Sequence, residues 1–124
     1  MLVHVIDDDP TFLGIFKRYL KPHHVECFKN AIDAVAALEK TVPDLIFLDI
    51  MLDGPDGFTY LNEISSYADT VRVPVVLISS LYHTLPKMSS YNVIAYLDKT
   101  TFTPVDVQKI LKLVSSKKPT EVHS

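Results

Sequence analysis

Carboxylate, hydroxyl and ammonium side chains directly follow the short apolar segments of this sequence. If carboxylates gathered within a few ångströms, they would repel one another, and one would protonate unless a cation intervened. A hard divalent ion such as Mg²⁺, held by oxygen ligands, would remove that repulsion. A carboxylate can also accept a phosphoryl group, whose oxygens a metal, a lysine and a hydroxyl would then bind. The pattern therefore predicts Asp-based phosphoryl transfer by residues drawn from Asp7, Asp8, Asp9, Asp49, Ser79, Ser80, Asp98 and Lys99.

Strands and helices alternate strictly along the predicted chain. Apolar runs bounded by acids, prolines or turn residues predict strands over 2–6, 25–28, 45–48, 73–78 and 93–97. Apolar residues three and four apart predict helices around Phe12–Leu20, Ala31–Leu38, Phe58–Ile64 and Val107–Val114. This order is typical of an α/β, doubly wound, five-stranded parallel sheet, whose functional site lies at the carboxyl ends of its strands.

Local signals also place the helix starts. Asp9 and Pro10 suit an N-cap and a first helical position, and Asn30 can cap the second helix. Between Ser79 and Tyr96 the apolar spacing is poor and Pro86 interrupts it, so we expect a short or distorted helix there.

Composition limits the classes of function. The chain has 124 residues and a formal net charge of −3, which disfavours direct binding to nucleic acid. Its single cysteine, Cys27, excludes an internal disulfide. Its apolar runs are far shorter than the roughly 20 residues of a membrane-spanning helix. With acids already at Asp7 and no signal peptide, the sequence predicts a cytoplasmic protein without membrane association.

Four separated motifs, VIDDDP, PDLIFLDIMLDGPDGF, PVVLISS and AYLDK, occur in this order after the predicted strands. With them the sequence resembles the receiver domain of bacterial two-component response regulators, of the single-domain, chemotaxis-regulator-like type. The resemblance extends from residue 2 to about residue 115. It implies a flavodoxin-like (βα)₅ fold with strand order 2-1-3-4-5. We therefore expect a receiver domain over residues 1–116 and a polar tail over 117–124.

The resemblance also implies a role for each site residue. Asp49 would accept a phosphoryl group from a histidine kinase or a histidine phosphotransfer protein, and the switched surface would then bind an unknown downstream protein. Ser79 and Lys99 would assist the transfer, and Ser79 with Tyr96 would form the switch. Mg²⁺ would be held by Asp7, Asp8, Asp49 and the backbone carbonyl of Met51. Apart from transfer to its own aspartate and its slow hydrolysis, the chain would not be an enzyme.

The sequence departs from the family pattern at several positions. The lysine is usually followed by proline through a cis bond, but here Thr100 follows it. A cis bond before a residue other than proline costs about 2.5–4 kcal/mol, so either the bond is trans and the loop shifts, or strain is retained. Asp53 stands where proline is usual, with Pro55 two residues later. Met51 and Leu81 are apolar at positions that line the path of attacking water in the family, which predicts slow autodephosphorylation.

Three other functions remain open at this point. Asp7 to Thr11 fits the DxDxT signature of haloacid-dehalogenase-type phosphatases, although Asp49 then precedes Ser79 and Lys99 in the wrong order. A flavodoxin-like cofactor binder would share the architecture, but three aspartates in the first loop would repel a phosphate. A receiver fold could also serve as an unphosphorylated adaptor, an alternative that the departures at Asp53 and Thr100 keep open.

Overall fold

A five-stranded parallel sheet forms the centre of the protein, in the order β2-β1-β3-β4-β5. The structure is a computed structural model that describes residues 1–52, 57–80 and 91–116. The strands are β1 (Leu2–Ile6), β2 (His24–Phe28), β3 (Leu45–Asp49), β4 (Val75–Ser79) and β5 (Val93–Asp98). Both the α/β class and the strand order predicted from the sequence are therefore confirmed.

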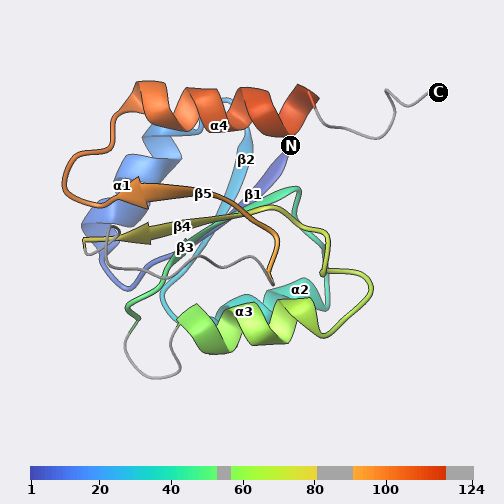
Figure 1. Cartoon of the computed structure of the whole chain (residues 1–124). Coiled ribbons are helices and arrows are strands. Elements are labelled where there is room, and N and C mark those ends of the chain that lie inside the picture. Colours follow the sequence, from blue (N-terminus) through green and yellow to red (C-terminus); the bar gives the residue numbers. More distant parts are fainter. Residues whose placement is uncertain (53–56, 81–90, 117–124) are drawn as a thin grey trace.

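Helices cover both faces of this sheet (Figure 1), and those of the described residues form one pair on each face. One pair is α1 (Pro10–Tyr19) with α4 (Pro104–Ser116), and the other is α2 (Ala31–Leu38) with α3 (Gly57–Ser65). The predicted caps are present at two helix starts. Asp9 accepts a hydrogen bond from the Thr11 N–H at 2.9 Å, and Asn30 accepts one from the Asp33 N–H at 2.8 Å. Each cap satisfies a backbone donor that the first helical turn leaves unpaired.

The sheet separates two hydrophobic cores. One lies between the sheet and the α1/α4 pair and includes Phe16 and Phe47. The other lies between the sheet and the α2/α3 pair and includes Tyr60 and Leu48. Because helices cover both faces, β3 and β4 are buried along their whole length, which is why their sequences are almost continuously apolar. The two cores occupy the faces of the sheet, whereas buried polar side chains, among them Asp7, Asp49 and Ser79, lie at its carboxyl edge.

Several expectations fall on residues 53–56, 81–90 and 117–124, which lie outside the described part of the chain. They concern the short helix around Pro86, the departures at Asp53 and Pro55, the role of Leu81 and the polar tail. Within the described residues, no helix is long and apolar enough to cross a membrane.

Candidate functional site

Three carboxylates converge at the carboxyl edge of the sheet. Asp49 is the last residue of β3, and Asp7 and Asp8 directly follow β1, the strand paired with β3. Oxygens of the three carboxylates lie within 4.8 Å of one another. Asp7 is 0% exposed and Asp49 is 2% exposed, so their charges are largely removed from water. The convergence predicted from the strand ends is therefore present.

Lys99 enters this cluster from the loop after β5. Its Nζ atom donates a hydrogen bond to Asp49 Oδ2 at 2.9 Å and one to Asp7 Oδ1 at 3.3 Å. The Lys99 backbone N–H donates to the Ser79 carbonyl at 3.1 Å, which holds the start of this loop against the end of β4. A single ammonium thus bridges the carboxylates that follow two neighbouring strands.

Backbone N–H groups also hold carboxylate oxygens of this cluster. Asp7 Oδ1 accepts from the Asp9 N–H at 2.9 Å, and Asp49 Oδ1 accepts from the Met51 N–H at 2.9 Å. Asp7 Oδ2 is buried and has no hydrogen-bond partner among the described residues, although Lys99 Nζ lies 3.2 Å away as an ion pair. A buried carboxylate oxygen with a free lone pair is suited to a further cationic ligand.

Burial and like charge act together on Asp7. Its burial, and to a smaller extent the charge of Asp49, raise the pKa of Asp7 to about 6, although the Asp9 N–H and Lys99 oppose the shift. Burial alone lowers the pKa of Lys99, but the hydrogen bond to Asp49 and the charges of both carboxylates outweigh it and raise that pKa. At neutral pH the lysine is therefore charged, and one ammonium faces three carboxylates.

This donor set fits a hard divalent cation. Mg²⁺ binds oxygen ligands at about 2.0–2.1 Å, so two ligands on opposite sides of the ion are about 4.2 Å apart. The observed spacing of up to 4.8 Å among the three carboxylates requires only a small closure around such an ion. Asp7 Oδ2 accepts no hydrogen bond among the described residues, and a bound cation would give it a second positive neighbour besides Lys99.

Comparison with known families agrees with this geometry. The model of the response regulator receiver domain matches residues 3–114. The chain belongs to this family. Receiver domains of two-component signalling are signalling modules rather than dedicated enzymes, so the match does not favour the phosphatase alternative.

Relatives of known sequence and structure resemble this receiver domain along most of its length. PilH from Pseudomonas aeruginosa is 28% identical over 116 residues, covering 90% of this chain and 93% of PilH. The heme response regulator HssR from Staphylococcus aureus is 33% identical over 78 residues, covering 61% of this chain and 34% of HssR. The chain therefore matches only about a third of HssR.

A solved structure shares the fold. The receiver domain of the sensor histidine kinase PA1611 from Pseudomonas aeruginosa, with a magnesium ion in its active-site cleft, superposes with a TM-score of 0.76. The two sequences are 23% identical, and the match covers 90% of this chain and 94% of that domain.

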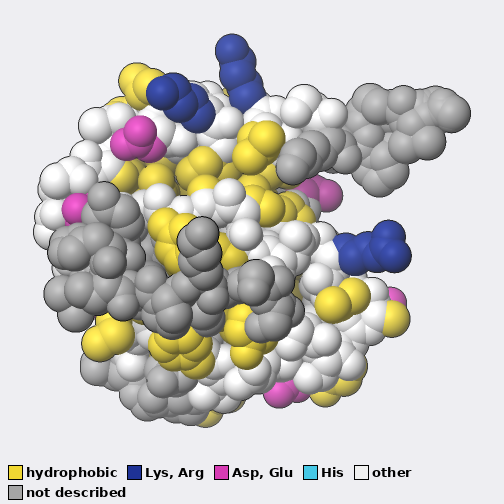
Figure 2. All heavy atoms as spheres, in the orientation of Figure 1, with side chains coloured by type: hydrophobic (Ala, Val, Ile, Leu, Met, Phe, Trp, Pro, Cys, Tyr) yellow, Lys and Arg dark blue, Asp and Glu magenta, His cyan; other side chains and the backbone are white. Residues whose placement is uncertain are grey.

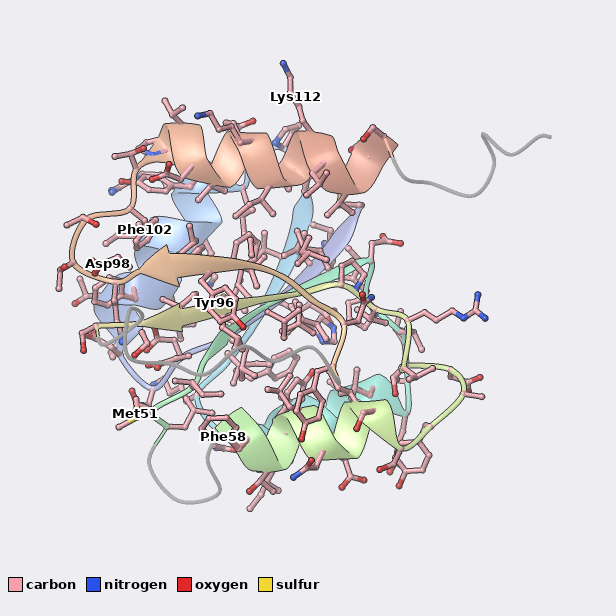
Figure 3. All side chains as sticks on the ribbon, viewed as in Figure 1. Met51, Phe58, Tyr96, Asp98, Phe102 and Lys112 are labelled. Atoms are coloured by element: carbon pink, nitrogen blue, oxygen red, sulfur yellow. The ribbon has the colours of Figure 1, made fainter. Side chains whose placement is uncertain are left out.

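The other predicted site residues of this receiver domain surround the carboxylates to different degrees. Ser79 ends β4 and is 1% exposed, and β4 lies beside β3. Met51 contacts Asp49 through its backbone N–H, while its side chain is exposed. Tyr96 lies on β5, partly buried against the core beneath α2 and α3 (Figure 3). The phosphoryl-transfer and switch roles of these residues remain predictions.

The loop after Lys99 resolves one question left by the sequence. Lys21–Pro22 is the cis peptide bond among the described residues, so the Lys99–Thr100 bond is trans. Asp98 Oδ1 accepts hydrogen bonds from the Thr100 N–H at 2.9 Å and the Thr100 hydroxyl at 2.6 Å. The side chain of Asp98 thus closes the turn that proline makes elsewhere in the family.

Sequence reasoning missed an aromatic contact to the site. The Phe12 ring centroid, on α1, lies 4.5 Å from Lys99 Nζ. Phe102 lies in the loop between β5 and α4 (Figure 3). Its ring centroid is 6.4 Å from that of Phe12 and 5.1 Å from that of Phe16, on which it stacks. Helical periodicity identified Phe12 as part of an apolar face, but it carries no information about which distant side chain that ring meets.

Proposed function

We propose that this receiver domain accepts a phosphoryl group on Asp49 from a phosphohistidine of a histidine kinase or histidine phosphotransfer protein. The observation that supports it best is the bridge from Lys99 Nζ to Asp49 at 2.9 Å and to Asp7, beside a buried oxygen without a hydrogen-bond partner. A carboxylate held in this way is oriented and lies close to a fixed positive charge. Those are the requirements for a carboxylate nucleophile toward phosphorus.

In the proposed transfer, the phosphoryl group passes from the donor imidazole to Asp49. A carboxylate oxygen of Asp49 forms a new O–P bond while the P–N bond to the donor imidazole breaks, and the imidazole leaves with that electron pair and takes up a proton. Lys99 Nζ, already hydrogen-bonded to Asp49, moves to the phosphoryl oxygens as their charge approaches. The Met51 N–H holds Asp49 Oδ1 and so fixes the plane of the carboxylate.

Asp7, Asp8 and Asp49 are the side chains that would hold Mg²⁺, with the Met51 carbonyl as the backbone ligand. The bound ion would neutralise charge on the phosphoryl oxygens during transfer. Asp7 contributes the buried oxygen that has no hydrogen-bond partner, and the Asp9 N–H fixes the orientation of its carboxylate.

Switching and the later loss of the phosphoryl group would depend on residues other than the three aspartates. Ser79, at the end of β4, would hydrogen-bond a phosphoryl oxygen, and Tyr96 would change its packing against the core beneath α2 and α3. Met51 and Leu81 carry no group that could orient an attacking water, so hydrolysis of the aspartyl phosphate would be slow. The receiver domain would comprise residues 1–116 and act in the cytoplasm, without direct contact with nucleic acid or membrane.

Intact mass measurement after incubation with acetyl phosphate and Mg²⁺ tests this function. The expected result is a gain of one phosphoryl group, about 80 Da, that requires the metal. Asp49→Asn should abolish the gain, whereas the matched control Asp69→Asn, at an aspartate outside the cluster, should retain it. No gain in the unaltered chain would contradict the proposal and favour an unphosphorylated adaptor.

A further inference from the structure

Helices α2 and α3 lie on the sheet face opposite α1 and α4 (Figure 1). Side chains of this pair line a groove along the seam between the two helices. It consists of two depressions of about 250 Å³ and about 270 Å³. Val35 and Glu63 border both depressions, so the two are continuous. The groove is separate from the carboxylate cluster at the end of the sheet.

Each wall of the groove is a row of side chains at helical spacing. Ile32, Val35 and Glu39 lie three and four residues apart along α2 and its C-cap, and Thr59, Glu63 and Tyr67 lie four apart along and just beyond α3. Ile32 is 65% exposed and Tyr67 is 55% exposed. Two large apolar side chains therefore stand at the rim with most of their surface in water.

Among the described residues, the charged side chains that line this groove are all acidic: Glu39, Glu63 and Asp69. Helices α2 and α3 contain no lysine or arginine. By contrast, α1 and α4 contain four, and Figure 2 shows basic side chains projecting beyond α4. The Tyr67 hydroxyl donates to Glu63 at 2.9 Å, and this bond, with the charges of Glu63 and Glu39, raises the pKa of Tyr67. The groove thus combines an apolar strip with a negative field.

The floor of the groove also has an unusual polar atom. Tyr60 lines one depression, is 0% exposed, and its hydroxyl has no hydrogen-bond partner among the described residues. A buried hydroxyl without a partner costs about 1–3 kcal/mol. The groove therefore has both exposed apolar side chains at its rim and, at its floor, a hydroxyl that makes no hydrogen bond among the described residues.

We propose that the α2/α3 groove binds an amphipathic helix of a protein partner, with apolar side chains facing Val35 and Tyr60 and flanking lysines or arginines facing Glu39, Glu63 and Asp69. A helix fits because the walls are themselves helical rows, and a third helix can pack its ridges into the groove between two others. The two rows extend over seven and eight residue steps, about 10–12 Å at the rise of an α-helix, which two to three turns of a bound helix would cover. The acidic lining disfavours nucleic acid as the occupant.

Titration of the ¹⁵N-labelled full chain with a synthetic 14-residue peptide tests the proposal. The probe contains leucine at helical spacing (i, i+3, i+4, i+7) and lysine elsewhere, and its counterpart carries glutamate in place of every lysine. The lysine peptide should saturate with a Kd below about 1 mM, and the largest amide shifts should fall on α2 and α3. The glutamate peptide should bind at least tenfold more weakly.

Variants on the groove separate this site from general attraction to an acidic protein. The double variant Glu39→Gln/Glu63→Gln should weaken binding at least fivefold, and Ile32→Ala at least threefold. The matched control is Val105→Ala on α4, because Val105 is 60% exposed, close to the 65% of Ile32, and this variant should leave the affinity unchanged. The substituted side chains Ile32, Glu39 and Val105 are exposed and Glu63 is partly exposed, so the variants should keep the amide dispersion of the folded chain.

Several results would overturn the proposal. They are equal affinity for the two peptides, shifts centred on α1 or α4, unchanged affinity in the glutamine variant, or no saturation. A concentration-dependent shift of the α2 and α3 amides in the chain alone would show instead that a second copy occupies the groove. None of these readouts depends on phosphorylation of Asp49, so this test and that of the proposed function can fail independently.

Discussion

The aromatic ring over Lys99 makes a prediction that can be worked from distances. Phe12→Leu keeps an apolar side chain on α1 but removes the ring that lies 4.5 Å from Lys99 Nζ. A cation–π contact contributes about 0.5–1 kcal/mol at exposed sites and about 2 kcal/mol when desolvated. The Lys99 side chain is only 17% exposed, so we expect loss of the ring to raise the activation free energy of phosphorylation by about 1–2 kcal/mol. This corresponds to a rate about five- to thirtyfold lower.

The assay is the initial rate of phosphorylation by acetyl phosphate at saturating Mg²⁺, followed by intact mass. Because Phe12 contacts the lysine and not the carboxylates, the affinity for Mg²⁺ should change by less than twofold. Phe102→Leu is the matched control. Phe102 stacks on Phe16 and packs near Phe12, but among the described residues the ring in cation–π contact with Lys99 is that of Phe12. It should cost stability but little rate.

A double-mutant cycle decides whether the ring acts through the lysine. On a Lys99→Met background, Phe12→Leu should have no further effect on the rate, because the charge that the ring holds is gone. An unchanged rate in the single variant would refute the reasoning. So would an equal loss in Phe102→Leu, or the same fold loss with and without Lys99.

Three further predictions concern the backbone and the metal. Gly57→Ala should lower the free energy of unfolding in urea by about 1–3 kcal/mol, because its Cβ would lie 2.6 Å from the Ile50 Cα; an unchanged midpoint would contradict this close contact. Since the pKa of Asp7 is about 6 and Mg²⁺ requires the ionised carboxylate, the Kd for Mg²⁺ should rise about tenfold from pH 8 to pH 5; a flat profile by calorimetry would show that Asp7 is ionised throughout. Asn30→Ala should cost about 1 kcal/mol, measured by thermal unfolding, because the Asp33 N–H loses its cap; Asn30→Ser should restore most of it.

The features that could be predicted from the sequence are those encoded locally. The apolar run ending at Asp49 is a buried strand because both faces of the sheet are covered, and such a run needs no information from elsewhere in the chain. The same holds for Asp9 and Asn30, whose capping bonds reach only two or three residues ahead. Topology then placed Asp7 beside Asp49, since parallel strands end at one edge.

The features that could not be predicted depend on side chains distant in sequence. Whether the bond after Lys99 is cis or trans remained open, because the turn is closed by Asp98, whose hydrogen bonds to Thr100 replace the geometry that proline supplies. The ring over Lys99 was missed for a similar reason. A helical pattern shows that Phe12 faces the apolar side of α1, but the contact joins residues 87 positions apart.

The arrangement of the two cores explains why the edge chemistry and the groove are separate. Phe12 and Phe102 connect the carboxylate cluster to the core beneath α1 and α4, because Lys99 leaves β5 on that side. Tyr96, one strand position before Leu97, points to the opposite core, the one whose outer boundary is the α2/α3 groove. Alternation along β5 therefore turns Leu97 toward the core beneath α1 and α4, and Tyr96, to which the family resemblance assigns a switching role, toward the opposite core. Lys99, in the loop that follows the strand, meets Phe12 on the α1 side.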